Sequence, residues 1–158
     1  MSMIRRAQPR DADAIARMVA AASLEDQRPP PALDADLVRA HGFGAGALFE
    51  AFVAEQGGQP VGCAIATKGY DIDVASATLV VAVLYVAPSG RRDGLARRLL
   101  AEIAARAMDI GARELIITTG VDNSVAQRFF AAVGAEAQTR KTFLLGRDQI
   151  EWLSQERA

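Results

Sequence analysis

The chain has 158 residues and a mass of 16.8 kDa, so we expect one domain over residues 1–158, large enough to fold around its own core. Its 18 Lys and Arg residues nearly balance 19 Asp and Glu residues, and the net charge of −1 argues against a protein that coats nucleic acid or an anionic membrane. The single cysteine excludes an intrachain disulfide and, with one histidine, argues against a dedicated zinc site. We therefore expect a cytoplasmic protein without a bound metal.

Local patterns predict helices and strands in an order that combines antiparallel hairpins with a strand–helix–strand crossover. Apolar spacing, turn residues and glycine caps set the boundaries. The expected elements are a strand at 3–7, helices at 9–23 and 33–40, strands at 48–55, 61–68 and 77–86, a helix at 94–109, a strand at 113–119, a helix at 123–133, a strand at 139–145 and a weakly helical tail from 147. This order indicates an α/β or α+β fold with a mixed sheet.

The strand expected at 77–86 is apolar on both faces, which indicates a central strand covered on both sides. Strict alternation divides its side chains into two rows. One row contains Leu79, Val81, Val83 and Tyr85, and the other contains Val80, Ala82, Leu84 and Val86.

The junction after this strand carries the strongest chemical signal. A loop rich in Arg and Gly follows Val86, and the next helix begins at Gly94, so free backbone N–H groups and the positive end of a helix dipole point at one place. Gly94 has no Cβ to block an approaching phosphate, and Arg91, Arg92 and Arg97 add charged donors. These features predict an anion site, most readily for a pyrophosphate. The alternative is an ordinary turn with solvated arginines.

Two other nucleotide-binding patterns are excluded. Residues 42–47 fit a loose dinucleotide fingerprint, but they precede a strand and open no helix. The sequence also contains no GxxxxGK[ST] motif, which excludes a P-loop nucleotidase.

The pattern Arg91-x-x-Gly94-x-Ala96, after a strand that ends Val86-Ala87-Pro88, resembles the acetyl-CoA motif of the GNAT acetyltransferase superfamily. Residues 123–135 resemble the second signature of that family, in the correct order and after an intervening strand. A weaker resemblance, in residues 37–55, 61–64 and 70–71, is to the diamine (spermidine/spermine) and thialysine acetyltransferases.

The resemblance implies a mixed, mostly antiparallel sheet that is flanked by helices and splayed at its two parallel central strands. It also implies acetyl-CoA as co-substrate, a small-molecule amine as acceptor, direct attack of the amine on the thioester, and a homodimer. The cofactor-binding residues would be Leu84, Tyr85, Val86, Arg91, Arg92, Asp93, Gly94, Leu95, Ala96, Arg97, Thr118, Asn123, Ala126 and Phe130.

The sequence departs from the family at the acid–base positions. Phe130 stands where many relatives have a tyrosine that protonates the departing thiolate, and Ala82 stands where diamine acetyltransferases have a glutamate. The catalytic residues are therefore unknown, with Tyr85 and Ser124 as candidates.

Asp71 and Asp73 are candidates for attracting a cationic amine, or they belong to an ordinary solvated turn. Two alternatives to a small-molecule N-acetyltransferase stay open, the first favoured by the missing acid–base residues and the second left undecided because the sequence has no peptide-groove signature. One is an acyl-CoA-binding or regulatory domain with little catalytic activity, and the other is a protein or peptide N-acetyltransferase. The preference for Arg over Lys and the abundance of Ala indicate a GC-rich bacterial genome.

Overall fold

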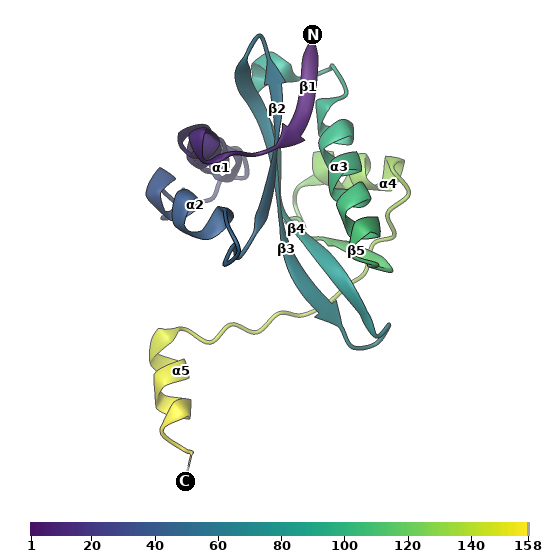
Figure 1. Ribbon diagram of the computed structural model, residues 1–158. Helices are drawn as coiled ribbons and strands as arrows, with labels where there is room; N and C mark the ends of the chain where they lie inside the picture. The colour runs from purple at the N-terminus through teal and green to yellow at the C-terminus, as the bar shows by residue number, and fades with distance from the viewer. Residues whose placement is uncertain (158) are drawn as a thin grey trace.

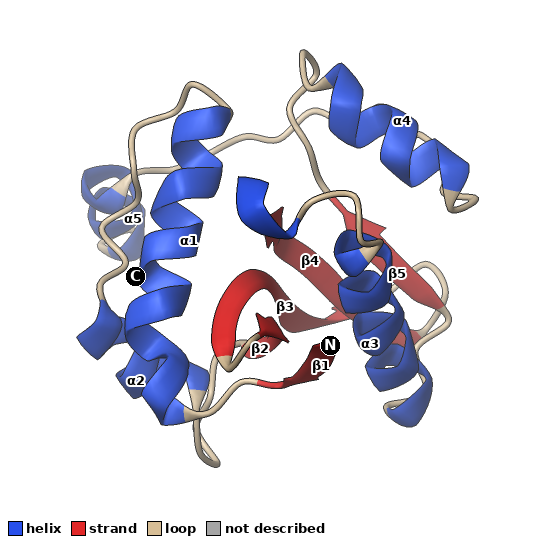
Figure 2. Cartoon of the chain, turned by 90° about the horizontal axis from the view of Figure 1, so that it is seen from above, coloured by secondary structure: helices blue, strands red, loops and turns tan. Residues whose placement is uncertain are grey.

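A computed structural model describes residues 1–157 as a five-stranded sheet with helices on both faces. Helices α1 and α2 lie on one side of the sheet, and α3 and α4 lie on the other (Figures 1 and 2). The elements are β1 (Ser2–Arg6), α1 (Ala12–Glu25), α2 (Ala35–Gly42), β2 (Glu50–Gln56), β3 (Gln59–Asp71), β4 (Ser76–Val86), α3 (Leu95–Asp109), β5 (Glu114–Ile117), α4 (Ser124–Ala132) and α5 (Arg147–Ser154), with single 3-10 turns at Pro9–Asp11 and Pro88–Gly90. The predicted α/β architecture with a mixed sheet is confirmed.

The strands follow one another across the sheet in chain order, from β1 to β5. The first four pair antiparallel, whereas β4 and β5 pair parallel. The parallel pairing begins at Thr78 with Glu114 and stops at Val81 with Ile117, although β4 continues to Val86. Beyond Val81, β4 therefore has no strand partner on its β5 side within residues 1–157. We call this point the β4–β5 fork. Strand β5 itself ends here, at Ile117, and within residues 1–157 it is the outer strand of the sheet, not a central one as expected.

A β-bulge lies directly at the fork. Ile65 of β3 pairs with Val83 and Ala66 pairs with Val81, so Ala82 is an extra residue in β4. One extra residue reverses the faces that follow it. Before the bulge Leu79 and Val81 pack toward α3; after it Leu84 and Val86 pack there, while Val83 and Tyr85 pack toward α1. The strict alternation predicted from the sequence is wrong beyond Ala82.

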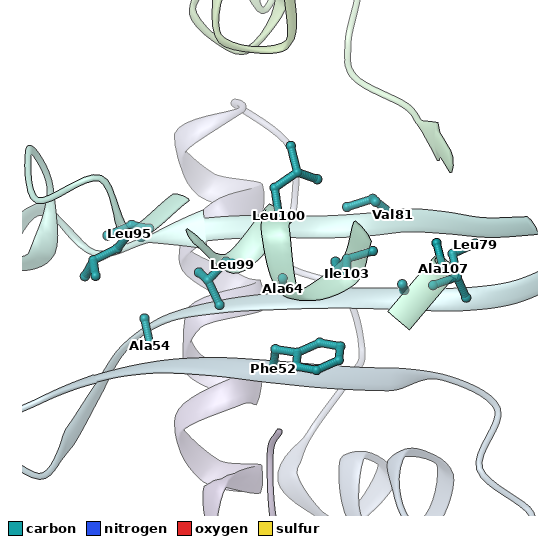
Figure 3. Close-up of a cluster of buried hydrophobic side chains, with 12 residues drawn as sticks. Phe52, Ala54, Ala64, Leu79, Val81, Leu95, Leu99, Leu100, Ile103 and Ala107 are labelled. Atoms are coloured by element: carbon teal, nitrogen blue, oxygen red, sulfur yellow. The ribbon is translucent and has the colours of Figure 1, made fainter. Parts of the chain in front are cut away.

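Two apolar clusters hold the helices against the sheet. On one face, Leu95, Leu99, Ile103 and Ala107 of α3 meet side chains of β2, β3 and β4, among them Phe52 (Figure 3). On the other face, Ile15 and Val19 of α1 and Val38 of α2 pack against Val53, Cys63 and Ile65. Cys63 is completely buried, which fits a packing residue.

The predicted strand at 139–145 is wrong. Residues 135–146 form neither helix nor strand, and residues 134–157 are all exposed. A strand needs an adjacent edge to satisfy its backbone groups, and no strand lies beside this segment in the part of the chain that the structure describes. The helical tail is confirmed as α5. No helix in residues 1–157 is long and apolar enough to cross a membrane.

A buried carboxylate ties β2 to α3. Glu50 is 6% exposed, and its oxygens accept hydrogen bonds from Arg106 at 2.7 and 3.0 Å, with Lys68 at 3.2 Å and Arg6 at 3.5 Å. The hydrogen bonds from Arg106 lower the pKa of Glu50 to about 2, against an ordinary value of 4.5, although burial opposes the shift. This carboxylate stabilises the fold only while it is ionised.

We predict that the free energy of unfolding falls as the pH drops from about 4.5 to about 2, because the unfolded chain takes up this proton first. A pKa lowered this far corresponds to about 3 kcal/mol at neutral pH. Glu50→Gln should lose most of this stability at pH 7 and flatten this part of the pH dependence, measured by urea unfolding. Glu102→Gln, at an exposed site on α3, is the control. Parallel pH curves for wild type and Glu50→Gln would contradict the assignment.

Candidate functional site

The loop between β4 and α3 ends in an open helix N-terminus. Gly94 is the N-cap of α3 and has a φ of +69°. Because glycine has no side chain, it cannot bond the first N–H groups of the helix. The first turn also carries no acidic residue. Arg92, two residues earlier, also has a positive φ, of 78°. A Cβ built on Gly94 would have no atom within 4 Å. The orphan N–H groups and the helix dipole therefore face open space, as an anion site requires.

Two glycines that the sequence analysis did not single out hold this loop against the sheet. A Cβ on Gly90 would lie 3.1 Å from Val61 and 3.2 Å from Val86, and a Cβ on Gly62 would lie 3.0 Å from the carbonyl oxygen of Tyr85. Such close approach leaves little room for a side chain at either position. Their spacing in the sequence carries no signal, because it depends on which strands become neighbours.

Arg91 does not reach toward the open helix end. Its Nη2 lies 2.6 Å from both carboxylate oxygens of Glu25, the last residue of α1, and its Nε donates to the carbonyl oxygen of Val86 at 2.9 Å. The guanidinium carbon lies 5.9 Å from the ring centroid of Tyr85. The first arginine of the predicted motif is thus paired with a carboxylate that sequence analysis did not identify.

Tyr85 shares this carboxylate. The Tyr85 hydroxyl donates to Glu25 at 3.3 Å. Burial raises the pKa of Tyr85, and the negative charge of Glu25 raises it further. The phenol therefore stays protonated near neutral pH and retains a proton to donate.

The other flank of the fork is the start of α4. Asn123 caps this helix by accepting from the backbone N–H of Ala126 at 3.0 Å, and its amide donates to Asp26 at 2.9 Å. Glu25 and Asp26, which we call the α1 terminus, thus contact both flanks of the fork. Thr118 follows β5 and Ser124 begins α4, and both are exposed.

The remaining predicted cofactor residues fall into three groups. Arg92 and Arg97 are exposed and form no hydrogen bond or ion pair within residues 1–157, so both guanidinium groups are available to an anion. The Asp93 carboxylate accepts from Gln56 at 2.8 Å. Leu95 is buried in the core, so only its backbone can face the loop; Leu84 and Ala96 are half-buried and Val86 is buried.

The structure does not bring Asp71 and Asp73 to the fork. They lie in the β3–β4 turn, where Asp71 accepts from the backbone N–H of Asp73 at 2.9 Å. At the usual rise per residue, about 17 Å of β4 separates this turn from the fork at Val81, and about 33 Å separates it from the end of the strand at Val86. This geometry favours the solvated-turn interpretation.

Phe130 is half-buried on α4 and meets Phe129 edge to face, with 5.4 Å between the ring centroids. It has no hydroxyl to offer. Among the residues that the structure describes, no group of three or more His, Cys, Asp or Glu side chains is arranged to hold a metal ion.

Comparisons with known proteins agree with this geometry. An uncharacterized N-acetyltransferase of Mycobacterium tuberculosis (strain H37Rv) is 33% identical over 93 residues, which cover 59% of this chain and 56% of that protein. The match thus spans little more than half of the relative's length.

Solved structures share the fold at lower identity. An integron cassette protein from the mobile metagenome of V. cholerae superposes with a TM-score of 0.79 at 17% identity, covering 98% of both chains. A ribosomal-protein-alanine N-acetyltransferase from Brucella melitensis gives 0.74 at 20% identity, over 92% of this chain and all of that one. An aminoglycoside N-acetyltransferase in complex with CoA gives 0.74 at 22%, over 93% and 95%.

The sequence model of the acetyltransferase (GNAT) family matches residues 16–135, which include the fork, the open end of α3 and the start of α4. Since this match covers well over half of the sequence, the chain belongs to the GNAT acetyltransferase family.

Proposed function

We propose that the protein is an acetyl-CoA-dependent N-acetyltransferase that acetylates a primary amine of a small molecule. One observation carries the proposal: an unpaired strand edge, beyond Val81 of β4, leads directly to an uncapped helix N-terminus at Gly94. Coenzyme A has the two matching parts, an extended arm with amide groups and a pyrophosphate.

The arm would pair with the free edge of β4 from Val83 to Val86 as an added strand. The pyrophosphate would accept hydrogen bonds from the first N–H groups of α3, where no side chain competes. Arg92 and Arg97 would add charge-assisted donors from the same loop and helix turn. Thr118, Asn123 and Ala126 would border the arm from the β5 and α4 side.

In the reaction, the neutral amine attacks the thioester carbonyl, a C–N bond forms, and the C–S bond breaks to release the thiolate. The nitrogen gives up one proton as the amide forms and the thiolate takes up one, so the proton count balances. A backbone N–H would stabilise the oxyanion that develops in between. The bulge at Ala82 supplies a suitable place, because a bulged residue leaves the ladder and frees backbone groups at the fork.

Tyr85 is our proposed proton donor to the thiolate, because it carries a hydroxyl on β4 beyond the fork; in this structure that hydroxyl donates to Glu25. Ser124 is the alternative hydroxyl. General acid–base assistance contributes 10²–10⁴-fold to the rate in typical enzymes. The loss of the tyrosine and glutamate that Phe130 and Ala82 replace should therefore slow the reaction without abolishing it.

The acceptor that we propose is cationic, because the α1 terminus places two carboxylates next to the fork. A small-molecule acceptor is favoured by one structural neighbour, an aminoglycoside N-acetyltransferase solved with CoA, which superposes over 93% of this chain. An amine of a protein is the second candidate acceptor, because the Brucella neighbour is a ribosomal-protein-alanine N-acetyltransferase. We expect the protein to form a homodimer and to be located in the cytoplasm.

Mass spectrometry tests the function directly. The protein is incubated with acetyl-CoA and a pooled metabolite extract supplemented with diamines and aminoglycosides, and newly acetylated species are sought. A product that requires both protein and acetyl-CoA is expected. CoA binding without any product would instead favour an acyl-CoA-binding domain.

The open space at Gly94 gives a second prediction. Gly94→Val should weaken CoA binding by at least 10-fold in calorimetry, because the new side chain fills the space in front of the helix and strains a positive φ. Gly111→Val is a matched control, since Gly111 also has a positive φ and open space but lies at the far end of α3. Equal losses in both variants would show that strain alone explains the effect.

The ion pair between Arg91 and Glu25 gives a third prediction. Glu25→Gln should tighten CoA binding about 2- to 5-fold, because the pyrophosphate then no longer competes with a carboxylate for Arg91. The KM for a cationic acceptor should rise in the same variant. Asp36→Asn, which removes another surface ion pair, with Arg39, is the control. Unchanged CoA affinity would mean that Arg91 does not contact the pyrophosphate.

A further inference from the structure

The loop between β4 and α3 is fastened to the rest of the molecule at three points. Gly90 packs closely against Val86, and Nε of Arg91 donates to the carbonyl oxygen of Val86. The third contact comes from β2, 37 residues earlier in the chain. Nε2 of Gln56, the last residue of that strand, donates to Oδ2 of Asp93 at 2.8 Å. The side chain of Asp93 is therefore held by a residue outside the loop.

Asp93 is an unexpected neighbour for an anion site. It directly precedes Gly94, the N-cap whose missing side chain leaves the first N–H groups of α3 without a cap. These N–H groups and the positive end of the helix dipole attract any nearby anion, a carboxylate of the same chain included. Asp93 is the single acidic residue between positions 87 and 97. It is thus the internal anion best placed to compete with a pyrophosphate.

In the structure the Asp93 carboxylate does not occupy the helix end. No side chain caps α3, and the carboxylate accepts from Gln56 instead. Gln56 is half-buried and pairs with Gln59 across the turn of the β2–β3 hairpin, so its backbone position is set by the sheet. Its amide therefore binds the carboxylate from a fixed place on the β2 side of the loop.

The backbone on either side of Asp93 also needs support. Arg92 has a φ of 78° and Gly94 a φ of 69°, so Asp93 lies between two left-handed residues. Residues other than glycine rarely adopt this conformation, and the contacts around Arg92 must offset its cost. The hydrogen bond from Gln56 fastens the one residue that lies between the two. It thus acts on the conformation of the loop and on the direction of its carboxylate together.

We propose that Gln56 is a positioning residue for cofactor binding: its amide holds the Asp93 carboxylate away from the N-terminus of α3 and so keeps the pyrophosphate site open. The inference rests on the proposed function, because that function assigns the pyrophosphate of coenzyme A to this helix end. It adds a residue of β2, which lies outside the loop and the helix that form the site. Gln56 acts through Asp93 and does not itself contact the cofactor.

Calorimetry on the full-length protein is the first test. Gln56→Ala should weaken CoA binding about 5- to 10-fold, because the released carboxylate turns to the free N–H groups and competes for them. The same loss is expected with inorganic pyrophosphate as the probe, since it resembles the one part of CoA that this contact affects. Gln59→Ala makes the same change at an exposed glutamine across the same turn, and it should leave both affinities unchanged.

Removing the charge of Asp93 separates positioning from a role in the fold alone. Asp93→Asn keeps an acceptor oxygen for Gln56 and should bind CoA as well as wild type or up to about 3-fold more tightly, because a like charge near the pyrophosphate is gone. Gln56→Ala combined with Asp93→Asn should then bind CoA within about 2-fold of Asp93→Asn alone. A loss caused by a disturbed fold would not be rescued in this way.

Two results would show that the inference is wrong while the proposed function stands. One is a double variant that binds CoA as weakly as Gln56→Ala alone. The other is a Gln56→Ala protein that binds CoA and pyrophosphate as tightly as wild type does. A wild-type protein that does not bind CoA at all would instead overturn the proposed function, and this inference with it.

Discussion

The early end of the parallel pairing between β4 and β5 determines most of what this structure can do. Four residue pairs hold the two strands together, and the pairing stops at Val81, where β5 itself ends at Ile117. The bulge at Ala82 coincides with this separation and reverses the side-chain faces, so that Tyr85 turns toward α1 and Val86 toward α3. A strand edge without a partner in residues 1–157, a phenol and an uncapped helix end thereby lie along the same end of β4 and the loop that follows it, although each is ordinary alone.

The α1 terminus then sets the electrostatics of this opening. Glu25 pairs with Arg91 on one flank, and Asp26 accepts from Asn123 on the other, so a single helix end contacts both sides of the fork. Both Glu25 and Arg91 are nearly half exposed, and an ion pair of that exposure is weak enough for a doubly charged pyrophosphate to displace. If the proposed pyrophosphate displaced Arg91, the Glu25 carboxylate would lose its cation and keep the hydrogen bond from the Tyr85 hydroxyl.

The features that the sequence predicted are those governed by local rules. Gly111 and Gly134 have positive φ just beyond the C-terminal ends of α3 and α4, as expected of glycine caps that follow amphipathic segments. The bulge at Ala82 was missed because it depends on the register with β3, and the Arg91–Glu25 pair was missed because 66 residues separate its partners. The strand at 139–145 was predicted from composition alone, which contains no information about whether an edge is available.

Strand β5 and helix α4, the least buried elements of the sheet region, also border the fork. Strand β5 and helix α4 contain no buried residue, so the β5 side of the opening is held mainly by its four pairs with β4 and by partial packing against α3. On the β4 side, by contrast, α3 and the long β3–β4 ladder fix the strand firmly. The position of β5, and with it the width of the fork, is therefore the least constrained dimension of the site.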